Sequence, residues 1–183
     1  MATALLTAPQ SPARFTTAEF AWMCERDAFA DIKVELIEGV LHRVPLNMNR
    51  HGAMQVQVLM GLAEAAGEKR VLATVGIDLG GATVVACDAA VLGERDRGGS
   101  GWLSPDELRL VVEISEGTLD RDYGLKQRLY AAAGVPTYWV VDLMRSVVHV
   151  FDRPSEDGYL GIDLVRFGEL LAVPASAATM TLD

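Results

Sequence analysis

The stretch LVVEISEGTLDRDYGLKQRLY, residues 110–130, decides the fold of this chain because it joins a buried strand directly to a helix. Within the strand at residues 108–115, the run from Leu110 to Ile114 is apolar except for Glu113. A buried carboxylate without a partner is costly. Three interpretations follow: Glu113 pairs with a cation such as Lys126, it holds a metal, or the strand lies elsewhere.

The rest of the chain changes repeatedly between helical and extended patterns. Hydrophobic spacing and capping residues predict helices at about 16–26, 47–67 and 120–133. Strands are predicted at about 33–38, 40–44, 70–79, 83–92, 108–115, 137–141, 147–151, 159–165 and 170–173. This order predicts an α/β (α+β) fold with a mixed β-sheet flanked by helices. We expect a flexible arm at residues 1–13, a mobile loop at 93–106 and a single domain at 14–183.

Composition limits the classes of protein to consider. The chain has 183 residues, of which 50% are hydrophobic, which is typical of one globular domain. Its net charge of −9 disfavours a tight nucleic-acid binder but leaves room for a local basic groove. Cys24 and Cys87 show no metal-ligand spacing. No apolar run is long enough for a signal peptide or a membrane span, so we expect a cytoplasmic protein with no membrane contact.

A second acid interrupts another apolar strand. Side-chain alternation places Glu113 on one face of its strand with Val111, and Ile114 on the other face. In the strand at 83–92, the same alternation places Asp88 on a face with Ala90. Acids on consecutive strands can lie side by side, and both then ionise cheaply only if a cation lies between them. A divalent ion with oxygen ligands meets that requirement.

Glu35 and Lys126 extend this set of candidate residues. Glu35 is a third acid in an apolar context, within the half-buried strand at 33–38. Lys126 is one of only three lysines and lies on the helix that directly follows the Glu113 strand. Its side chain can therefore reach back over the end of that strand. A cation beside a metal and two carboxylates suits phosphoryl transfer to water.

Several of these segments resemble a known family. The matching segments are VELIEG at 34–39, CDAAV at 87–91, LVVEIS at 110–115 and GVPTYWVVD at 134–142, with Asp122, Lys126 and Tyr130 between the last two. They resemble the Uma family, a large group of bacterial proteins assigned to the PD-(D/E)XK nuclease superfamily. The resemblance runs from about Thr16 to Val173, and residues 113–142 are its most specific part.

The resemblance implies a restriction-endonuclease-like core and a metal site. It implies that Asp88 and Glu113 bind Mg²⁺ or Mn²⁺, and that the Ile114 carbonyl adds a ligand. It also implies a role for an acid from the first hairpin, which Glu35 matches. We expect Glu35 to complete or orient the site.

Two positions depart from the superfamily pattern, and one histidine has two interpretations. In the superfamily, a lysine two positions after the Glu assists the attacking water, but Ser115 occupies that position here. The resemblance therefore assigns the role to Lys126 on the next helix. Cys87 stands where a proline usually precedes the Asp. His51 matches a histidine of the family, although a capping or core role explains it equally well.

Together these features predict a metal-dependent nuclease that hydrolyses phosphodiester bonds. We expect nucleic acid as its partner, DNA rather than RNA, and a homodimer. The alternative is a non-catalytic domain that keeps the fold for oligomer or partner contacts, which the net charge of −9 favours. An intermediate possibility is a nuclease to which a partner protein delivers DNA.

Overall fold

The computed structural model describes residues 12–45, 48–93 and 101–183. Its helices are α1 (Thr17–Cys24), α2 (Asn49–Ala66) and α3 (Gln127–Ala132), with short 3₁₀ turns at Glu68–Arg70 and Pro105–Glu107 and a π-helix, η3, at Asp120–Lys126. Its strands are β1 (Lys33–Ile37), β2 (Val40–Val44), β3 (Val71–Gly80), β4 (Thr83–Leu92), β5 (Leu108–Ser115), β6 (Thr137–Asp142), β7 (Val147–Ser155), β8 (Gly158–Arg166), β9 (Leu171–Ala172) and β10 (Thr179–Met180).

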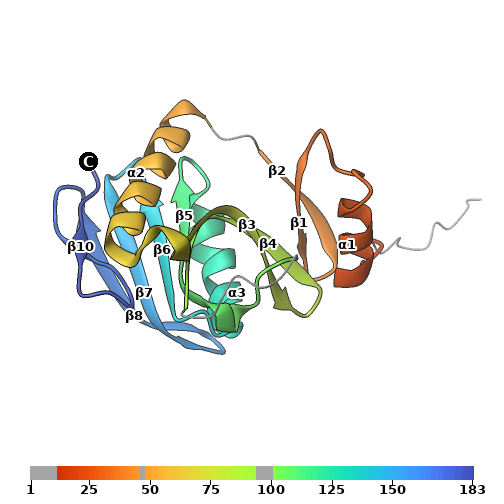
Figure 1. Ribbon diagram of the computed structural model, residues 1–183. Helices are drawn as coiled ribbons and strands as arrows, with labels where there is room; N and C mark the ends of the chain where they lie inside the picture. Colours follow the sequence, from red (N-terminus) through yellow and green to blue (C-terminus); the bar gives the residue numbers. More distant parts are fainter. Residues whose placement is uncertain (1–11, 46–47, 94–100) are drawn as a thin grey trace, which may run out of the picture.

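One mixed eight-stranded sheet organises the molecule (Figure 1). Its strands follow the order β2-β1-β4-β5-β6-β7-β8, and β3 pairs with β4. Among the strands in the described part of the chain, β5 and β6 alone pair in parallel, and η3 and α3 form the crossover between them. The predicted mixed α/β class, with a mixed sheet flanked by helices, is confirmed.

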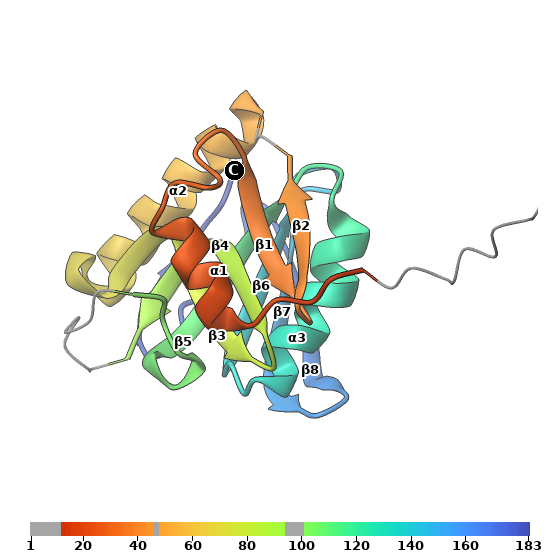
Figure 2. The same ribbon diagram turned by 90° about the vertical axis from the view of Figure 1, so that its right-hand side faces the viewer.

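Helices cover both faces of the sheet, and each face has its own apolar core (Figure 1). Met54, Val58 and Leu62 of α2 pack on one face. Tyr130 and Ala131 of α3 pack on the other face. Near the N-terminus, α1 packs Phe20 in a small third cluster beside β1 and β4 (Figure 2). The predicted Thr16 capping box at the start of α1 is present.

The helix expected at 120–133 has a different period from the one predicted. Its first seven residues, Asp120–Lys126, form a π-helix, and only Gln127–Ala132 is α-helical. In a π-helix the backbone hydrogen bonds join residues five apart rather than four. Side chains five residues apart therefore lie on the same side of the π-helix. In an α-helix, side chains with this spacing point in different directions.

The expected mobile loop at 93–106 is only partly covered by the structure, because residues 94–100 lie outside the described residues. Where the chain resumes, it is ordered by contacts. Leu103 forms a parallel bridge with Ile77, and Trp102 stacks on Phe20 with ring centroids 5.3 Å apart. The mobility of the loop stays a prediction. Residues 1–11 of the expected arm also lie outside the described residues.

No helix among residues 12–45, 48–93 and 101–183 is both long enough and apolar enough to cross a membrane.

Candidate active site

The candidate residues gather where the sheet branches. β3 runs along one edge of β4, while β1 and β5 share the other edge. β1 pairs at Val84, and β5 pairs from Ala89 onward. Between them, the backbone of Ala86 is satisfied by side chains: its N–H donates to Glu35 Oε1 at 3.2 Å, and its C=O accepts from Lys126 Nζ at 2.9 Å. The branch thus leaves room for buried polar side chains inside the sheet.

Side-chain alternation in β4 breaks at Asp88. Cys87 packs on the α3 side together with Ala90, whereas Ala89 packs on the α2 side. The prediction that Asp88 and Ala90 share a face through regular alternation is therefore wrong. The cause lies on the neighbouring strand, where Thr74 has a φ of 48° and the ladder skips the pair between Thr74 and Asp88.

Asp88 is held by groups from α2 and from β5. Its Oδ2 accepts a hydrogen bond from the backbone N–H of Ile114 at 2.8 Å and lies 3.1 Å from Nε2 of His51. The Asp88 carbonyl accepts from the side chain of Gln55 at 2.8 Å. Burial alone would raise the pKa of Asp88, but the bonds from His51 and Ile114 outweigh it and lower the pKa. Asp88 is therefore kept ionised.

The Glu113 side chain points towards η3 and α3, on the face of the sheet opposite to α2. Its Oε1 accepts from Lys126 Nζ at 2.7 Å and from the Tyr130 hydroxyl at 2.8 Å. Burial raises the pKa of Glu113 to about 7; Lys126 opposes the rise, and the charge of Asp88 adds to it. The two acids are thus on adjacent strands, as predicted, and the charge of Asp88 acts on Glu113. Their hydrogen-bond partners come from helices on opposite faces of the sheet.

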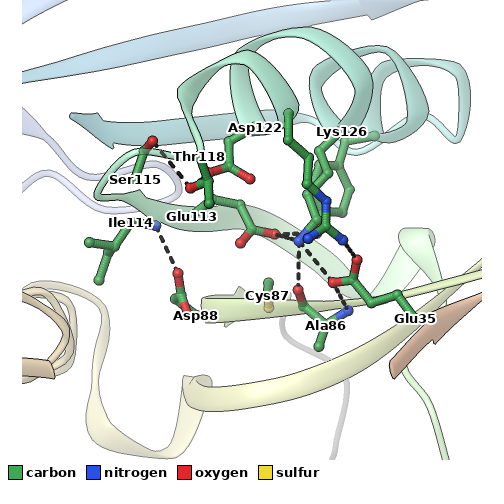
Figure 3. Close-up of polar contacts among 12 residues, drawn as sticks. Glu35, Ala86, Cys87, Asp88, Glu113, Ile114, Ser115, Thr118, Asp122 and Lys126 are labelled. Atoms are coloured by element: carbon green, nitrogen blue, oxygen red, sulfur yellow. Dashed lines mark hydrogen bonds and ion pairs between the residues drawn. The ribbon is translucent and has the colours of Figure 1, made fainter. Parts of the chain in front are cut away.

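Lys126 lies at the centre of the cluster (Figure 3). Its ammonium group contacts Glu113, the Ala86 carbonyl, and Oε1 of Glu35 at 3.0 Å. The contacts with Glu113 and Ala86 are hydrogen bonds, and the contact with Glu35 is an ion pair. The Lys126 side chain is only 4% exposed. The interpretation that Glu113 pairs with Lys126 is therefore confirmed.

Glu35 has both carboxylate oxygens occupied by protein groups. Oε1 binds Lys126 and the Ala86 N–H, and Oε2 binds the guanidinium of Arg121. Arg121 and Lys126 are five residues apart, so the π-helix brings them onto one side of the turn, where both reach Glu35. This arrangement fits the expectation that Glu35 orients the site better than a role as a metal ligand.

Each of the two acids uses one carboxylate oxygen for its protein contacts, Oδ2 in Asp88 and Oε1 in Glu113. Among the described residues, nothing donates a hydrogen bond to the other oxygens, Asp88 Oδ1 and Glu113 Oε2. Carboxylate oxygens are the ligands that Mg²⁺ and Mn²⁺ prefer. No three His, Cys, Asp or Glu side chains converge as a ligand set in the part of the chain that the structure describes. Backbone and water oxygens would therefore supply the remaining ligands.

Some residues of the cluster were not predicted from the sequence. Tyr130 was expected on a neighbouring helical turn, but its bond to Glu113 was not. Arg121 could be found only by knowing the π-helical period. Gln55 lies four residues after His51 on α2, and this spacing is the signal that both reach the same strand. His51 is buried and its Nε2 lies 3.1 Å from Asp88 Oδ2, so this buried histidine is also in contact with the site.

Comparison with known proteins assigns this arrangement to a family. The model of the Uma2 family, described as "Putative restriction endonuclease", matches residues 17–183. The chain belongs to the Uma2 family. A solved structure with a similar fold is a putative nuclease belonging to DUF820 from Anabaena variabilis. The two are 20% identical, with a TM-score of 0.64 over 82% of this chain and 88% of that one. A search of curated proteins gives no match.

The Uma2 assignment confirms the resemblance found in the sequence, and the structural neighbour confirms the nuclease-like fold. At 20% identity, the neighbour bears on the fold alone.

Proposed function

We propose that this Uma2 protein is a metal-dependent nuclease that hydrolyses phosphodiester bonds of nucleic acid, with DNA preferred over RNA. The observation that carries the proposal is the pair of acids on adjacent strands, each with one oxygen that accepts no hydrogen bond from a described residue, together with a buried lysine bonded to Glu113. Asp88 and Glu113 would hold Mg²⁺ or Mn²⁺ with these free oxygens. The Ile114 carbonyl is proposed as a further ligand.

A bound divalent ion supplies a Lewis acid for the phosphodiester and lowers the pKa of a water molecule. The protein contributes preorganisation. Hydrogen bonds from His51 and from the Ile114 N–H keep Asp88 ionised and aimed between the strands. Tyr130 stays protonated, because burial raises its pKa well above the usual value, so its hydroxyl continues to donate to Glu113.

Lys126 contributes positive charge next to the reacting phosphate. Negative charge grows on the phosphate oxygens during attack by water, and a fixed ammonium group stabilises it. Glu35 and Ala86 hold the ammonium group in place, so little reorganisation is needed. This role corresponds to that of the superfamily lysine. In this sequence Ser115 occupies the usual position of that lysine.

A homodimer or a partner protein suits the charge of the molecule. With a net charge of −9, one chain repels DNA at long range. A pair of chains would place two sites on a duplex, and a partner protein could deliver DNA to the site. Both remain part of the proposal.

A second function, binding without catalysis, is favoured by one specific observation. The ammonium group of Lys126 has three protein acceptors, so its donors are committed to holding the site together. A domain that keeps this cluster only to stabilise the branched sheet would show the same contacts.

A cleavage assay separates the two functions. Wild-type protein is incubated with plasmid, single-stranded DNA and RNA in Mg²⁺ or Mn²⁺, with EDTA as the metal-free arm. The nuclease proposal expects cleavage that EDTA stops and that Asp88→Asn or Glu113→Gln abolishes. Glu64→Gln changes an exposed acid on α2 and serves as the matched control.

Cleavage that persists unchanged in Asp88→Asn would indicate a contaminating enzyme or another site. A wild-type protein that cleaves none of the three substrates with either metal would support the binding function instead.

A further inference from the structure

Lys33 is a second lysine beside the site, at the start of β1. In a strand, side chains two positions apart lie on the same face. Ile37 packs in the core on the α3 side, whereas Val34 and Leu36 pack in the small cluster beside α1. Lys33 and Glu35 therefore lie on the α3 side, which is the side from which η3 contacts Glu35.

The position of Lys33 along β1 places it at the open branch of the sheet. β1 runs antiparallel to β4, with Leu36 opposite Val84. Counting along both strands from this pair places Lys33 level with Cys87, the residue before Asp88. At this point β1 has separated from β4 and β5 has not yet paired with it, so Lys33 borders the gap between β1 and β5.

Electrostatics agree with this placement. Burial acts to raise the pKa of Asp88, but the bonds from His51 and Ile114 lower it. The positive charge of Lys33 lowers the same pKa further. An ammonium group acts on a carboxyl group in this way only when the two are near each other. Lys33 is therefore close to one of the two acids proposed to bind the metal ion.

The ammonium group of Lys33 is free of the contacts that hold Lys126. Among the described residues, none forms a hydrogen bond or an ion pair with Lys33. Lys126 instead contacts two carboxylates and a backbone carbonyl. Lys33 is half-buried, and a lysine in such a position packs its aliphatic stem while the ammonium group stays in water. Its three N–H donors are thus available to a ligand.

We propose that Lys33 binds a backbone phosphate of the nucleic-acid strand and so positions that strand across the two acids. The proposal rests on the nuclease function proposed above. A phosphodiester that enters the branch brings its negative charge beside Asp88 and Glu113, which repel it. A nearby cation with free donors offsets this repulsion without breaking any internal contact. A phosphate contact fixes the strand in place and does not read its sequence.

Binding of a labelled single-stranded DNA oligonucleotide, followed by fluorescence anisotropy, tests the contact. The full chain carries Asp88→Asn and Glu113→Gln, so that the bound strand is not cleaved. Adding Lys33→Gln should raise the dissociation constant at least about tenfold, whatever the sequence of the oligonucleotide. The slope of the logarithm of the binding constant against that of the salt concentration should become shallower by about 0.7, the loss of one phosphate contact.

Two variants accompany this measurement. Lys69→Gln makes the same change at an exposed lysine on the turn after α2 and is the matched control, whose binding and salt slope should not change. Lys33→Arg keeps the positive charge and should keep the salt slope. Circular dichroism and a thermal melt confirm that each variant is folded.

Kinetics and metal binding separate strand positioning from an effect on Asp88. With otherwise wild-type protein, Lys33→Gln should raise KM about tenfold and lower kcat much less, because the lost contact holds the strand before reaction. Calorimetric titration with Mn²⁺ should give an affinity no weaker than that of the wild type. If Lys33 served only to keep Asp88 ionised, metal affinity would fall and the salt slope would stay constant.

The proposal is overturned if Lys33→Gln binds the oligonucleotide with the unchanged dissociation constant and salt slope. It is also overturned if the inactive protein with Lys33 intact binds no oligonucleotide, or if Lys33→Gln weakens Mn²⁺ binding alone. None of these results bears on whether the wild type cleaves. Absence of cleavage by the wild type would count against the nuclease function, whereas the Lys33 contact is judged by oligonucleotide binding.

Discussion

Lys126 and Glu35 form a buried ion pair, with Nζ 3.0 Å from Oε1 and side chains that are 4% and 1% exposed. Glu35 is on β1, in the N-terminal hairpin, whereas Lys126 ends the π-helix after β5. The hairpin therefore belongs to the site and is not an appendage of the sheet.

Loss of the lysine should cost both stability and activity. Lys126→Ala leaves Glu35 and Glu113 buried with one cation fewer, and breaking a buried pair in this way costs about 3–5 kcal/mol. Urea unfolding measures the loss, and Lys69→Ala, at an exposed lysine, should change stability by less than about 0.5 kcal/mol. The cleavage rate should fall roughly 10²–10³-fold.

The arginine variant separates charge from shape at this position. Lys126→Arg keeps the positive charge, but a planar guanidinium does not fit three acceptors arranged around one ammonium nitrogen. We expect it to recover little of the activity. A Lys126→Arg enzyme with the wild-type rate would show that charge alone is sufficient.

The histidine should act through Asp88. His51→Phe removes the donor 3.1 Å from Asp88 Oδ2 and should raise the pKa of that carboxyl group towards its ordinary range. Loss of such a supporting bond typically weakens metal affinity about 10–100-fold. Titration of Mn²⁺ by calorimetry measures the effect. His42→Phe changes an exposed histidine and should bind the ion as the wild type does.

Metal should stabilise the folded protein through the two acids. A ligand that binds only the native state raises the melting temperature by mass action. The rise with Mg²⁺ or Mn²⁺ should vanish in the double variant Asp88→Asn, Glu113→Gln and persist in Glu64→Gln. An undiminished metal response would place the ion elsewhere.

In EDTA, stability should fall as the pH rises towards 7. Burial raises the pKa of Glu113 from 4.5 to about 7, so between these values the folded state holds a proton that the unfolded state has released. The free energy of unfolding then decreases with pH, by at most ~1.4 kcal/mol per unit for one group. This contribution is fully present below pH 4.5 and is lost as the pH passes 7.

Glu113→Gln is the comparison for this pH dependence. It keeps the shape of the side chain but does not titrate, so its stability relative to the wild type should increase between pH 5 and 7. Urea unfolding at several pH values measures the difference. Parallel curves for the two proteins would mean that Glu113 is ionised in the fold throughout this range.

Much of the fold could be predicted because hydrophobic period and turn residues are local signals. The buried strand at 137–141, the hairpin at 33–44 and the helix at 47–67 were all predicted near their observed positions. The π-helix could not be found in this way, since its apolar residues also fit an α-helical period. The wider turn of the π-helix is evident only in the structure, where Arg121 and Lys126 both contact Glu35.

The sequence drew attention to Glu35, Asp88, Glu113 and Lys126 but did not show how their side chains are arranged. An acid in an apolar strand is a strong signal, which is why Glu35, Asp88 and Glu113 stood out. The directions of their side chains depend on neighbouring strands that local patterns do not specify. Asp88 turns because of Thr74 on β3, and this displacement appears only when the two strands are paired.

The branch in the sheet also provides a probe that needs no substrate. An amide inside a sheet is ordinarily shielded from hydrogen exchange by the next strand, whereas the Ala86 amide is shielded by the Glu35 carboxylate. Its exchange with deuterated solvent therefore reports on a side chain that Arg121 and Lys126 hold in place. The assembly of the whole polar cluster can be followed through one backbone hydrogen.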